Sequence, residues 1–294
     1  MVSVIIINYN TFQLTCDCIR SVRSATKDVD YEIILVDNAS TTDDADQFLS
    51  YFPDIKLIKS QTNDGFAKGN NRGISHASGD IILLLNSDTV LTEDSISIAA
   101  NYLANDAGNI SVLTTHLTYA DGVYQHNARA FRSIRNEFLD LCRPLLKLMP
   151  YRRRATLMLN QYFNGDFDTR CDWVSGAFFM FKKDLLNSLP QQKLDERFFM
   201  YGEDQLWCYQ FSKLGYRCCF LAGTHLVHIA NASTEPRKQL KLLTTIISRE
   251  LEIMRYRKGT SLYYYIFAAI FTAKERARYY IKLASQKIFR YRIR

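Results

Sequence analysis

Three short polar stretches and one pair of carboxylates carry the side chains of this sequence that could do chemistry. The stretches are Asn8-Tyr9-Asn10, Asp37-Asn38 and Asn86-Ser87-Asp88, each directly after an apolar run, and the pair is Glu203-Asp204. One or two carboxylates together with substrate phosphates are the usual binding site for Mg²⁺, which gives Asp88 a possible role. A carboxylate of the pair could remove a proton as a general base.

Each of these features also has a structural explanation. Asn, Asp and Ser favour helix N-caps and tight turns, so Asp88 could cap a helix beginning near Thr92, and Asp37 could cap the helix after it. The helix dipole alone favours Glu203 and Asp204 at a helix N-terminus. Three polar stretches at one edge of a sheet would nevertheless indicate a binding site.

The elements that must position these side chains alternate between strands and helices. Apolar runs predict strands at 2–7, 31–36, 55–58 and 81–85, and the intervening segments predict helices at 11–25, 43–51 and 67–77. This alternation predicts an α/β fold with a mostly parallel sheet. Right-handed crossovers then bring the loops after the first, second and fourth strands to one edge, where such sheets bind ligands.

The glycines argue against two common nucleotide-binding motifs. No G-x-G-x-x-G follows the first strand, and a Walker A sequence is absent. Gly65, Gly69 and Gly73 come later, where a loop enters a helix, so we expect them to permit close approach of the backbone.

Composition indicates a folded protein with reduced thiols. The chain has 294 residues, of which 47% are hydrophobic, enough for a sizeable core. Its seven cysteines are odd in number and form no C-x-x-C pair, which favours buried thiols in a reducing compartment over disulfides or a zinc site. The apolar start lacks the basic region and cleavage site of a signal peptide.

Four sequence blocks together resemble the inverting family-2 glycosyltransferases of GT-A fold, in particular the rhamnosyltransferase-like bacterial enzymes. The blocks are Val4-Ile-Ile-Ile-Asn-Tyr-Asn10, Val36-Asp-Asn-Ala-Ser40, Asn63-Asp-Gly-Phe-Ala-Lys-Gly-Asn-Asn-Arg-Gly73 and Leu84-Leu-Asn-Ser-Asp88. The resemblance covers residues 2–235 and implies a dTDP- or UDP-sugar donor with Mn²⁺ or Mg²⁺. Where this family often has D-x-D, the chain has Asn86-Ser87-Asp88, which leaves Asp88 as the main charged ligand.

The same resemblance implies roles for individual residues. The donor-binding set is Asn8, Asn10, Asp37, Asn38, Gly65, Asn71, Asn86, Ser87 and Asp88. Asp204 corresponds to the base of the family's Glu-Asp motif, and Glu203 to a residue that positions the acceptor. His228, rather than His225, corresponds to a metal-binding histidine, although a lone histidine is often only structural.

The acceptor side of the site is predicted at Cys171-Asp-Trp-Val-Ser-Gly-Ala177. Gly176 in a strand-like run indicates close approach by a ligand, or a bulge. Trp173 could stack on a sugar or belong to the core. We expect both residues at the acceptor, together with Glu203.

Two basic regions suggest a membrane partner. The first region, residues 129–170, is rich in Arg and Leu between positions 129 and 154. This composition predicts an insertion that faces a membrane or an anionic lipid-linked acceptor. The alternative is a solvated helical hairpin. From Lys274 onward eight basic residues and one acid give a charge of +7. Preceded by an apolar run at 262–273, too short to span a bilayer, this tail predicts an interfacial helix on an anionic membrane. A helix packed on the catalytic domain, or a dimer surface, is the alternative, and no motif supports nucleic-acid binding.

We therefore expect a glycosyltransferase domain at 1–236 and a helical, basic region at 237–294. The predicted function is metal-dependent, inverting transfer of rhamnose or another hexose to a hydroxyl of a cell-surface polysaccharide or lipid-linked oligosaccharide, at the cytoplasmic face of the membrane. The alternatives are a nucleotidyltransferase on a similar sheet, or a catalytically silent, membrane-docked partner of a glycosylation complex. A homo-oligomer is compatible with the predicted function.

Overall fold

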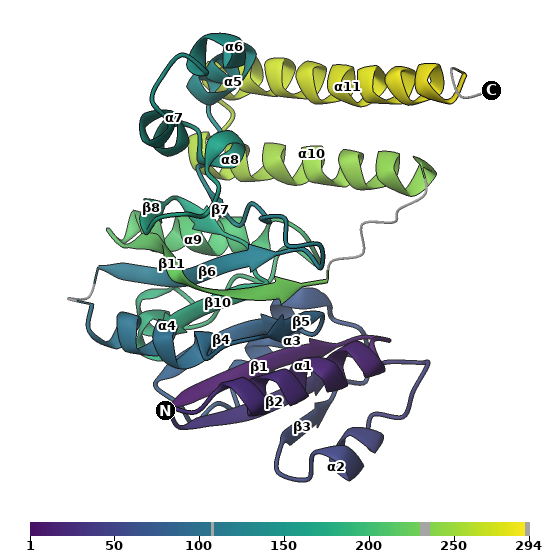
Figure 1. Ribbon diagram of the computed structural model, residues 1–294, viewed down its shortest axis with the longest axis vertical. Coiled ribbons are helices and arrows are strands. Elements are labelled where there is room, and N and C mark those ends of the chain that lie inside the picture. The colour runs from purple at the N-terminus through teal and green to yellow at the C-terminus, as the bar shows by residue number, and fades with distance from the viewer. Residues whose placement is uncertain (107–108, 230–235, 292–294) are drawn as a thin grey trace. The chain divides into compact units, whose positions relative to one another are not determined.

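The computed structural model describes residues 1–106, 109–229 and 236–291 (Figure 1). The chain divides into two compact units. Residues 1–131 and 152–232 form the first, and residues 132–151 and 233–294 form the second. Residues 132–151, expected in the catalytic domain, are grouped with the C-terminal helices in the structure.

A single large sheet runs through the first unit. Within the described residues it has nine strands: β1 (Val2–Asn8), β2 (Tyr31–Asp37), β3 (Lys56–Lys59), β4 (Ile81–Asn86), β5 (Thr89–Leu91), β6 (Ile110–Thr118), β8 (Thr169–Cys171), β10 (Phe178–Lys182) and β11 (Arg217–His228). Their order is β3-β2-β1-β4-β10-β6-β11-β5, and β8 pairs with β11. A separate small ribbon pairs β7 (Ala128–Arg129) with β9 (Trp173–Val174).

The parallel part of this sheet brings the predicted polar stretches to one edge. β1 pairs in parallel with both β2 and β4, and Asn8 is in register with Asp37 while Ile7 is in register with Asn86. β1, β2 and β4 are almost entirely buried, as aliphatic strands covered on both faces must be. The strand order reverses between β1 and β4, and the crevice at such a point is where these sheets bind ligands.

Helices complete the first unit. They are α1 (Phe12–Ala25), α2 (Gln47–Tyr51), α3 (Gly65–Ile74), α4 (Ser95–Ala104), α7 (Tyr151–Leu157), α8 (Leu159–Tyr162), α9 (Glu203–Lys213) and the 3₁₀ helix η1 (Lys183–Ser188). A Cβ at Gly73 would overlap the Ile5 side chain, so glycine there lets α3 pack closely on β1. The expected alternation of strands and helices is confirmed.

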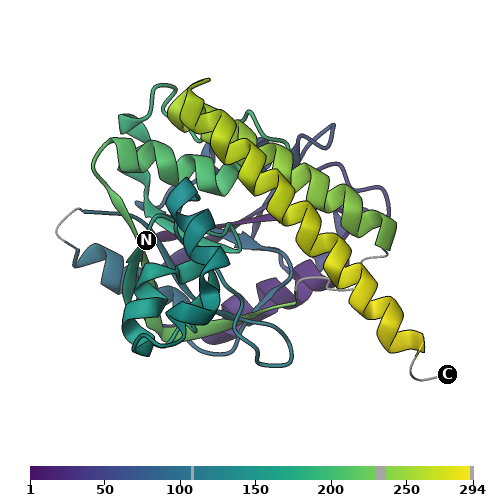
Figure 2. The ribbon, with the colours of Figure 1, turned by 90° about the horizontal axis from the view of Figure 1, so that it is seen from above.

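The second unit is helical. It contains α5 (Ile134–Leu141), α6 (Arg143–Leu146), α10 (Pro236–Lys258) and α11 (Leu262–Tyr291). Figures 1 and 2 show α10 and α11 side by side as an antiparallel pair. Their small core consists of Ile247, Met254, Tyr264, Phe267 and Phe271. No helix among the described residues combines the length and the hydrophobicity needed to cross a bilayer.

A charge cluster joins α5 to α11. The Lys274 ammonium pairs with Glu137 and, at 2.6 Å, with Asp140, while Arg278 reaches Asp140 at 2.6 Å. Arg132 lies 3.2 Å from Glu137. Two of the basic residues counted in the C-terminal tail, Lys274 and Arg278, are therefore neutralised by carboxylates inside this unit.

The cysteines form no disulfide. All seven are described and free, and six of them are buried, Cys142 being half-buried. The thiols of the six buried cysteines occupy core positions, which agrees with the expectation of buried thiols.

Candidate active site

The carboxyl ends of β1 and β2 are tied together by side-chain hydrogen bonds. Asn8, only 1% exposed, donates from Nδ2 to Asp37 Oδ1 at 2.7 Å and to Ser40 Oγ at 2.9 Å. The Asp37 carboxylate also accepts from Ser40 Oγ at 2.6 Å and from the Ser40 N–H at 3.1 Å. Asp37 therefore does not cap α2, which begins at Gln47. Its place at the sheet edge is fixed by its neighbours.

Three of the predicted donor-binding asparagines form hydrogen bonds to loop residues. Asn10, in a left-handed conformation at φ 56°, accepts from the Thr41 N–H at 2.7 Å. Asn38 donates to Asn63 Oδ1 at 2.9 Å. Asn71 donates to the Leu194 carbonyl at 2.8 Å and accepts from the Leu194 N–H at 3.1 Å. The structure therefore gives these three amides a role in holding loops, which the sequence did not reveal.

Asp88 and His228 meet at the end of β4. β11 pairs with β5 so that His228 is in register with Thr89, the residue after Asp88. His228 Nε2 lies 3.1 Å from Asp88 Oδ1 and 3.2 Å from Asn86 Nδ2. The capping alternative for Asp88 is wrong, because α4 begins at Ser95 and Asp94 caps it.

His225 has a different partner. Its Nδ1 lies 2.9 Å from Glu93 Oε1, which also accepts from the His225 N–H and from Thr224 Oγ1. Burial acts to raise the pKa of Glu93, but these hydrogen bonds outweigh it and the pKa is lowered. His225 thus contacts Glu93 rather than Asp88, and His228 is the histidine that the fold brings to the site.

Gln125 determines the tautomer of His228. The Gln125 amide nitrogen donates to the His228 carbonyl at 2.9 Å, which turns Gln125 Oε1 toward His228 Nδ1 at 2.6 Å. An amide oxygen can only accept, so Nδ1 carries a proton, and in the neutral imidazole the lone pair is then on Nε2. Sequence reasoning missed Gln125, which lies in a segment without a readable pattern.

The resulting pair is suited to a cation. With the imidazole neutral and its proton on Nδ1, Asp88 Oδ1 and His228 Nε2 are both acceptors 3.1 Å apart, and a cation bound by both would be stabilised by the two together. In an octahedral Mg²⁺ site, adjacent ligands are about 3 Å apart. The described residues contain no group of three or more His, Cys, Asp or Glu side chains that could hold a metal. The two residues therefore fit a divalent ion only if a substrate completes its coordination.

Asp204 is connected to the same edge through the backbone. It lies in the first turn of α9, after Gly202 at φ 95°. The Gly176 N–H donates to Asp204 Oδ2 at 3.1 Å, and the neighbouring Ala177 carbonyl accepts from the Asn86 N–H at 3.1 Å. Gly176 thus links the carboxylate of α9 to the end of β4.

The loop before α9 rests on the start of α3. Gly65, at φ 80°, faces the Phe199 carbonyl so closely that a Cβ would overlap it. The close approach predicted at this glycine therefore comes from the protein itself. The loop exposes Phe199, Met200 and Tyr201, with half or slightly less of each residue accessible, and Tyr201 is held at φ 68°.

The acceptor assignment of Trp173 needs correction. Trp173 is only 8% exposed, and the Arg129 guanidinium lies 5.0 Å from its ring centroid. A covered ring has no face for a sugar, so the structure supports the core alternative. Glu203 is buried at 6% exposure, at the N-terminus of α9.

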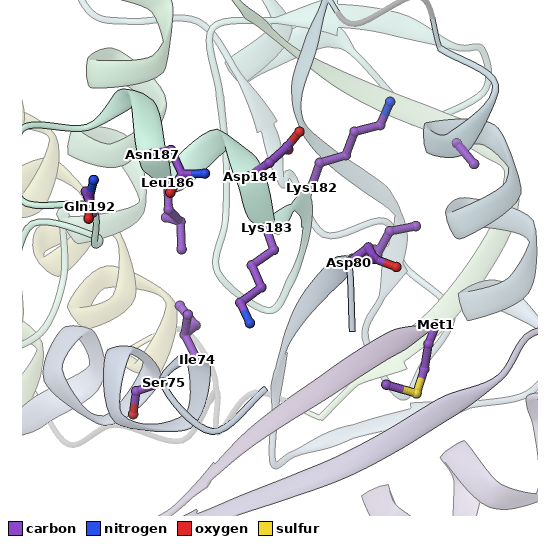
Figure 3. A pocket seen from close by; sticks show the side chains of 12 residues that line it. Met1, Ile74, Ser75, Asp80, Lys182, Lys183, Asp184, Leu186, Asn187 and Gln192 are labelled. Atoms are coloured by element: carbon purple, nitrogen blue, oxygen red, sulfur yellow. The ribbon is translucent and has the colours of Figure 1, made fainter. Parts of the chain in front are cut away.

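A cavity lies at the opposite edge of the sheet. Its volume is 790 Å³, and its lining includes Met1, Asp80, Lys182, Lys183 and Gln192 (Figure 3). Met1 and Asp80 precede β1 and β4, so this cavity is at the amino ends of those strands. Parallel sheets bind ligands at the carboxyl ends, and this cavity is therefore separate from the candidate site.

Comparison with known proteins identifies the family of the chain. The model of "Glycosyl transferase family 2" matches residues 3–189. The chain belongs to glycosyl transferase family 2. This family-2 glycosyltransferase is 22% identical over 211 residues to rhamnosyltransferase WbbL of Escherichia coli K12, covering 69% of this chain and 75% of that protein. It is 30% identical over 99 residues to glycosyltransferase GlyG of Streptococcus pneumoniae, and the match spans a third of either chain.

Solved structures share the fold. The mannosyltransferase PcManGT of Pyrobaculum calidifontis, in complex with GDP-Man and Mn²⁺, superposes with a TM-score of 0.58 at 16% identity, over 93% of this chain and 68% of that one. Residues 1–349 of TarS from S. aureus, in complex with UDP-GlcNAc, give 0.52 at 18% identity, over 84% and 66%. The GT-A fold and the glycosyltransferase class, both expected from the sequence, are confirmed.

Proposed function

We propose that this glycosyltransferase moves a sugar from a nucleoside diphosphate to a hydroxyl of a polysaccharide or lipid-linked oligosaccharide, with inversion at the anomeric carbon. One observation carries the proposal. The hydrogen bonds through Gly176 and Ala177 put the Asp204 carboxylate and the Asp88–His228 pair at the same end of β4. A direct displacement needs a base and a leaving-group site placed together in this way.

The donor would lie across the ends of β1, β2 and β4. Among the described residues, Asp37 Oδ2 accepts one hydrogen bond, from the Ser40 N–H, and can accept another from a ribose or base. Asp88 and His228 would hold Mn²⁺ or Mg²⁺ with the donor's diphosphate. When bound, such an ion neutralises charge on the departing diphosphate. The names of the structural neighbours, which include GDP-Man with Mn²⁺ and UDP-GlcNAc, support a nucleotide-sugar donor.

Asp204 would act as the base. Backbone N–H groups orient both of its oxygens, Gly176 at Oδ2 and Gln205 at Oδ1 with 2.8 Å. As the acceptor hydroxyl attacks the anomeric carbon from the side opposite the diphosphate, Asp204 takes its proton. The exposed loop at Phe199, Met200 and Tyr201 immediately precedes this carboxylate and offers an amphipathic surface for the acceptor.

Donor turnover tests the proposal. Purified protein is incubated with UDP-, dTDP- and GDP-sugars, Mn²⁺ or Mg²⁺ and acceptor extracts, and released nucleoside diphosphate is measured. Asp204→Asn should lower kcat by about 10²–10⁴-fold. Asp88→Ala removes a proposed metal ligand, so added metal should no longer stimulate turnover. Asp17→Asn, at an exposed carboxylate of α1, is the matched control.

Two results would reject the assignment. Full activity of Asp204→Asn would show that Asp204 is not the base. Release of pyrophosphate in place of nucleoside diphosphate would establish the nucleotidyltransferase alternative. The comparisons give that alternative no support. Rhamnose is the donor sugar suggested by the likeness to WbbL, and dTDP-rhamnose is therefore tested first.

A further inference from the structure

The second unit carries large apolar side chains that are exposed among the described residues. Phe138, Leu141, Leu145 and Leu148 are 64%, 63%, 67% and 85% exposed. Phe138 and Leu141 lie three residues apart on one side of α5, Leu145 is in α6, and Leu148 is in the turn after α6. We call these four residues the α5–α6 apolar face.

The polarity of α5 is inverted relative to a helix in water. Glu137 and Asp140, two of its charged residues, are 1% and 5% exposed and bind Lys274 of α11. The large apolar residues beside them point outward. A surface helix normally buries its apolar side and exposes its charges, so the environment outside the α5–α6 apolar face is expected to be less polar than water.

The net charge of the second unit indicates an anionic partner. Residues 132–151 and 233–294 contain 19 lysines and arginines against six aspartates and glutamates, a formal charge of +13. The remainder of the chain carries −6, since the total is +7. Exposed cations, among them Arg135 of α5 and Arg276 of α11, belong to the same unit.

These observations select an anionic membrane over a second copy of the chain. Two units of +13 repel each other, and a strong net charge keeps proteins apart. An anionic lipid surface attracts the same charge, and its acyl region takes up large apolar side chains that lie beside cations. Exposed tyrosines on α11, such as Tyr265 at 59% and Tyr280 at 60%, suit the interfacial layer of a bilayer.

We infer that the second unit docks this protein on an anionic membrane by inserting Phe138, Leu141, Leu145 and Leu148 among the lipids. The contact is peripheral and reversible. It needs both apolar insertion and electrostatic attraction, so either one alone gives weak binding. The inference does not depend on the proposed reaction, because vesicle binding is measured without donor or acceptor.

Vesicle co-sedimentation of the full chain tests the inference. We expect binding to vesicles of phosphatidylglycerol and phosphatidylcholine in equal amounts, weak binding to phosphatidylcholine alone, and release at high salt. The variant Leu141→Glu/Leu145→Glu/Leu148→Glu should bind at least about tenfold more weakly. Leu49→Glu, on the exposed side of α2 in the other unit, is the matched control and should bind as the unaltered protein does.

A tryptophan reporter separates insertion from surface attraction. The native Trp173 and Trp207 are buried, at 8% and 0% exposure, so Leu145→Trp adds an exposed indole. Its fluorescence should be quenched by lipids brominated in their acyl chains. Unchanged binding of the triple variant, equal binding to both vesicle types, or absence of quenching would overturn the inference. A dimer that the triple variant dissociates, without vesicle binding, would also overturn it and assign the face to a second copy.

Discussion

Gln125 holds the proton of His228 on Nδ1. The Gln125 amide is anchored by its donation to the His228 carbonyl at 2.9 Å, so its oxygen, 2.6 Å from Nδ1, has one possible role as an acceptor. In the neutral imidazole, His228 Nε2 then has its lone pair facing Asp88 Oδ1 at 3.1 Å. Gln125, in the irregular segment before β7, thereby orients His228 so that Nε2 can bind a metal ion. Partners of this kind orient metal-binding histidines and raise their basicity.

Replacing Gln125 should weaken metal binding without changing the metal ligands. Gln125→Met keeps the length of the side chain but removes the acceptor, so His228 can rotate or take the other tautomer. We expect affinity for Mn²⁺, measured by electron paramagnetic resonance in the presence of UDP, to fall by about 10–100-fold. Gln13→Met on the exposed side of α1 is the control. Equal Mn²⁺ affinity in Gln125→Met and the unaltered protein would contradict the role of Gln125.

Gly65 and Gly122 form a matched pair for testing the loop before α9. Both have φ near +80°, but a Cβ at Gly65 would overlap the Phe199 carbonyl, whereas a Cβ at Gly122 would meet nothing within 4 Å. Gly122→Ala should cost about 1–2 kcal/mol of unfolding free energy, from the left-handed backbone alone. Gly65→Ala should cost about 1–3 kcal/mol more, because the loop must move.

The displaced loop should also affect catalysis. Phe199, Met200 and Tyr201 precede Glu203 and Asp204, so Gly65→Ala should raise KM for the acceptor, while Gly122→Ala should leave it unchanged. Urea unfolding and steady-state kinetics on the same preparations measure both effects. Equal losses of stability in the two variants would show that contact with Phe199 is not what requires glycine at position 65.

Local patterns were sufficient to predict the sheet edge. The aliphatic strands and the polar residues after them predicted that Asn8, Asp37 and Asn86 would share an edge, and the register Asn8 to Asp37 and Ile7 to Asn86 shows that they do. Parallel pairing and right-handed crossovers leave few other arrangements. The family and the fold followed from the same residues.

Contacts between distant segments were not predictable in this way. Gln125 meets His228 across 103 residues, and Asn71 meets Leu194 across 123. No periodicity encodes such pairs, because they depend on how strands later in the chain are added to the sheet. The same holds for Trp173, whose burial depends on β7 and β9 pairing and on Arg129 lying over the ring. For the C-terminal tail, the sequence predicted only the net charge. The pairing of Lys274 with carboxylates of α5 depends on how the two helices pack, and only the structure shows it.

Lys274 should be critical to the stability of the helical unit. Its side chain is 7% exposed and lies between Glu137 and Asp140, whose side chains are 2% and 4% exposed. Lys274→Met leaves two carboxylates buried without their shared cation, and removing one partner of a buried pair costs about 3–5 kcal/mol. Arg276→Met, at an exposed position of the same helix, should change little. Urea unfolding followed by far-ultraviolet circular dichroism compares the two, and equal midpoints would show that the cluster is not stabilising.

Asp140 should make the helical unit sensitive to acid. Burial acts to raise the pKa of Asp140, but hydrogen bonds from Lys274 and Arg143 and the charges of Lys274 and Arg278 outweigh it and lower the pKa to about 2. The unfolded chain has the ordinary aspartate pKa of about 3.9. Because the folded pKa is the lower one, the stabilisation is complete above the unfolded pKa and disappears as pH falls through the folded value. The unfolding free energy of the unaltered protein should therefore exceed that of Asp140→Asn by a constant amount above about pH 5, and the difference should shrink between about pH 4 and pH 2. Glu252→Gln, at a carboxylate whose side chain is 47% exposed, serves as the control and should show no such convergence. A difference between the unaltered protein and Asp140→Asn that stays constant down to pH 2 would mean that the ionised carboxylate of Asp140 does not stabilise the unit.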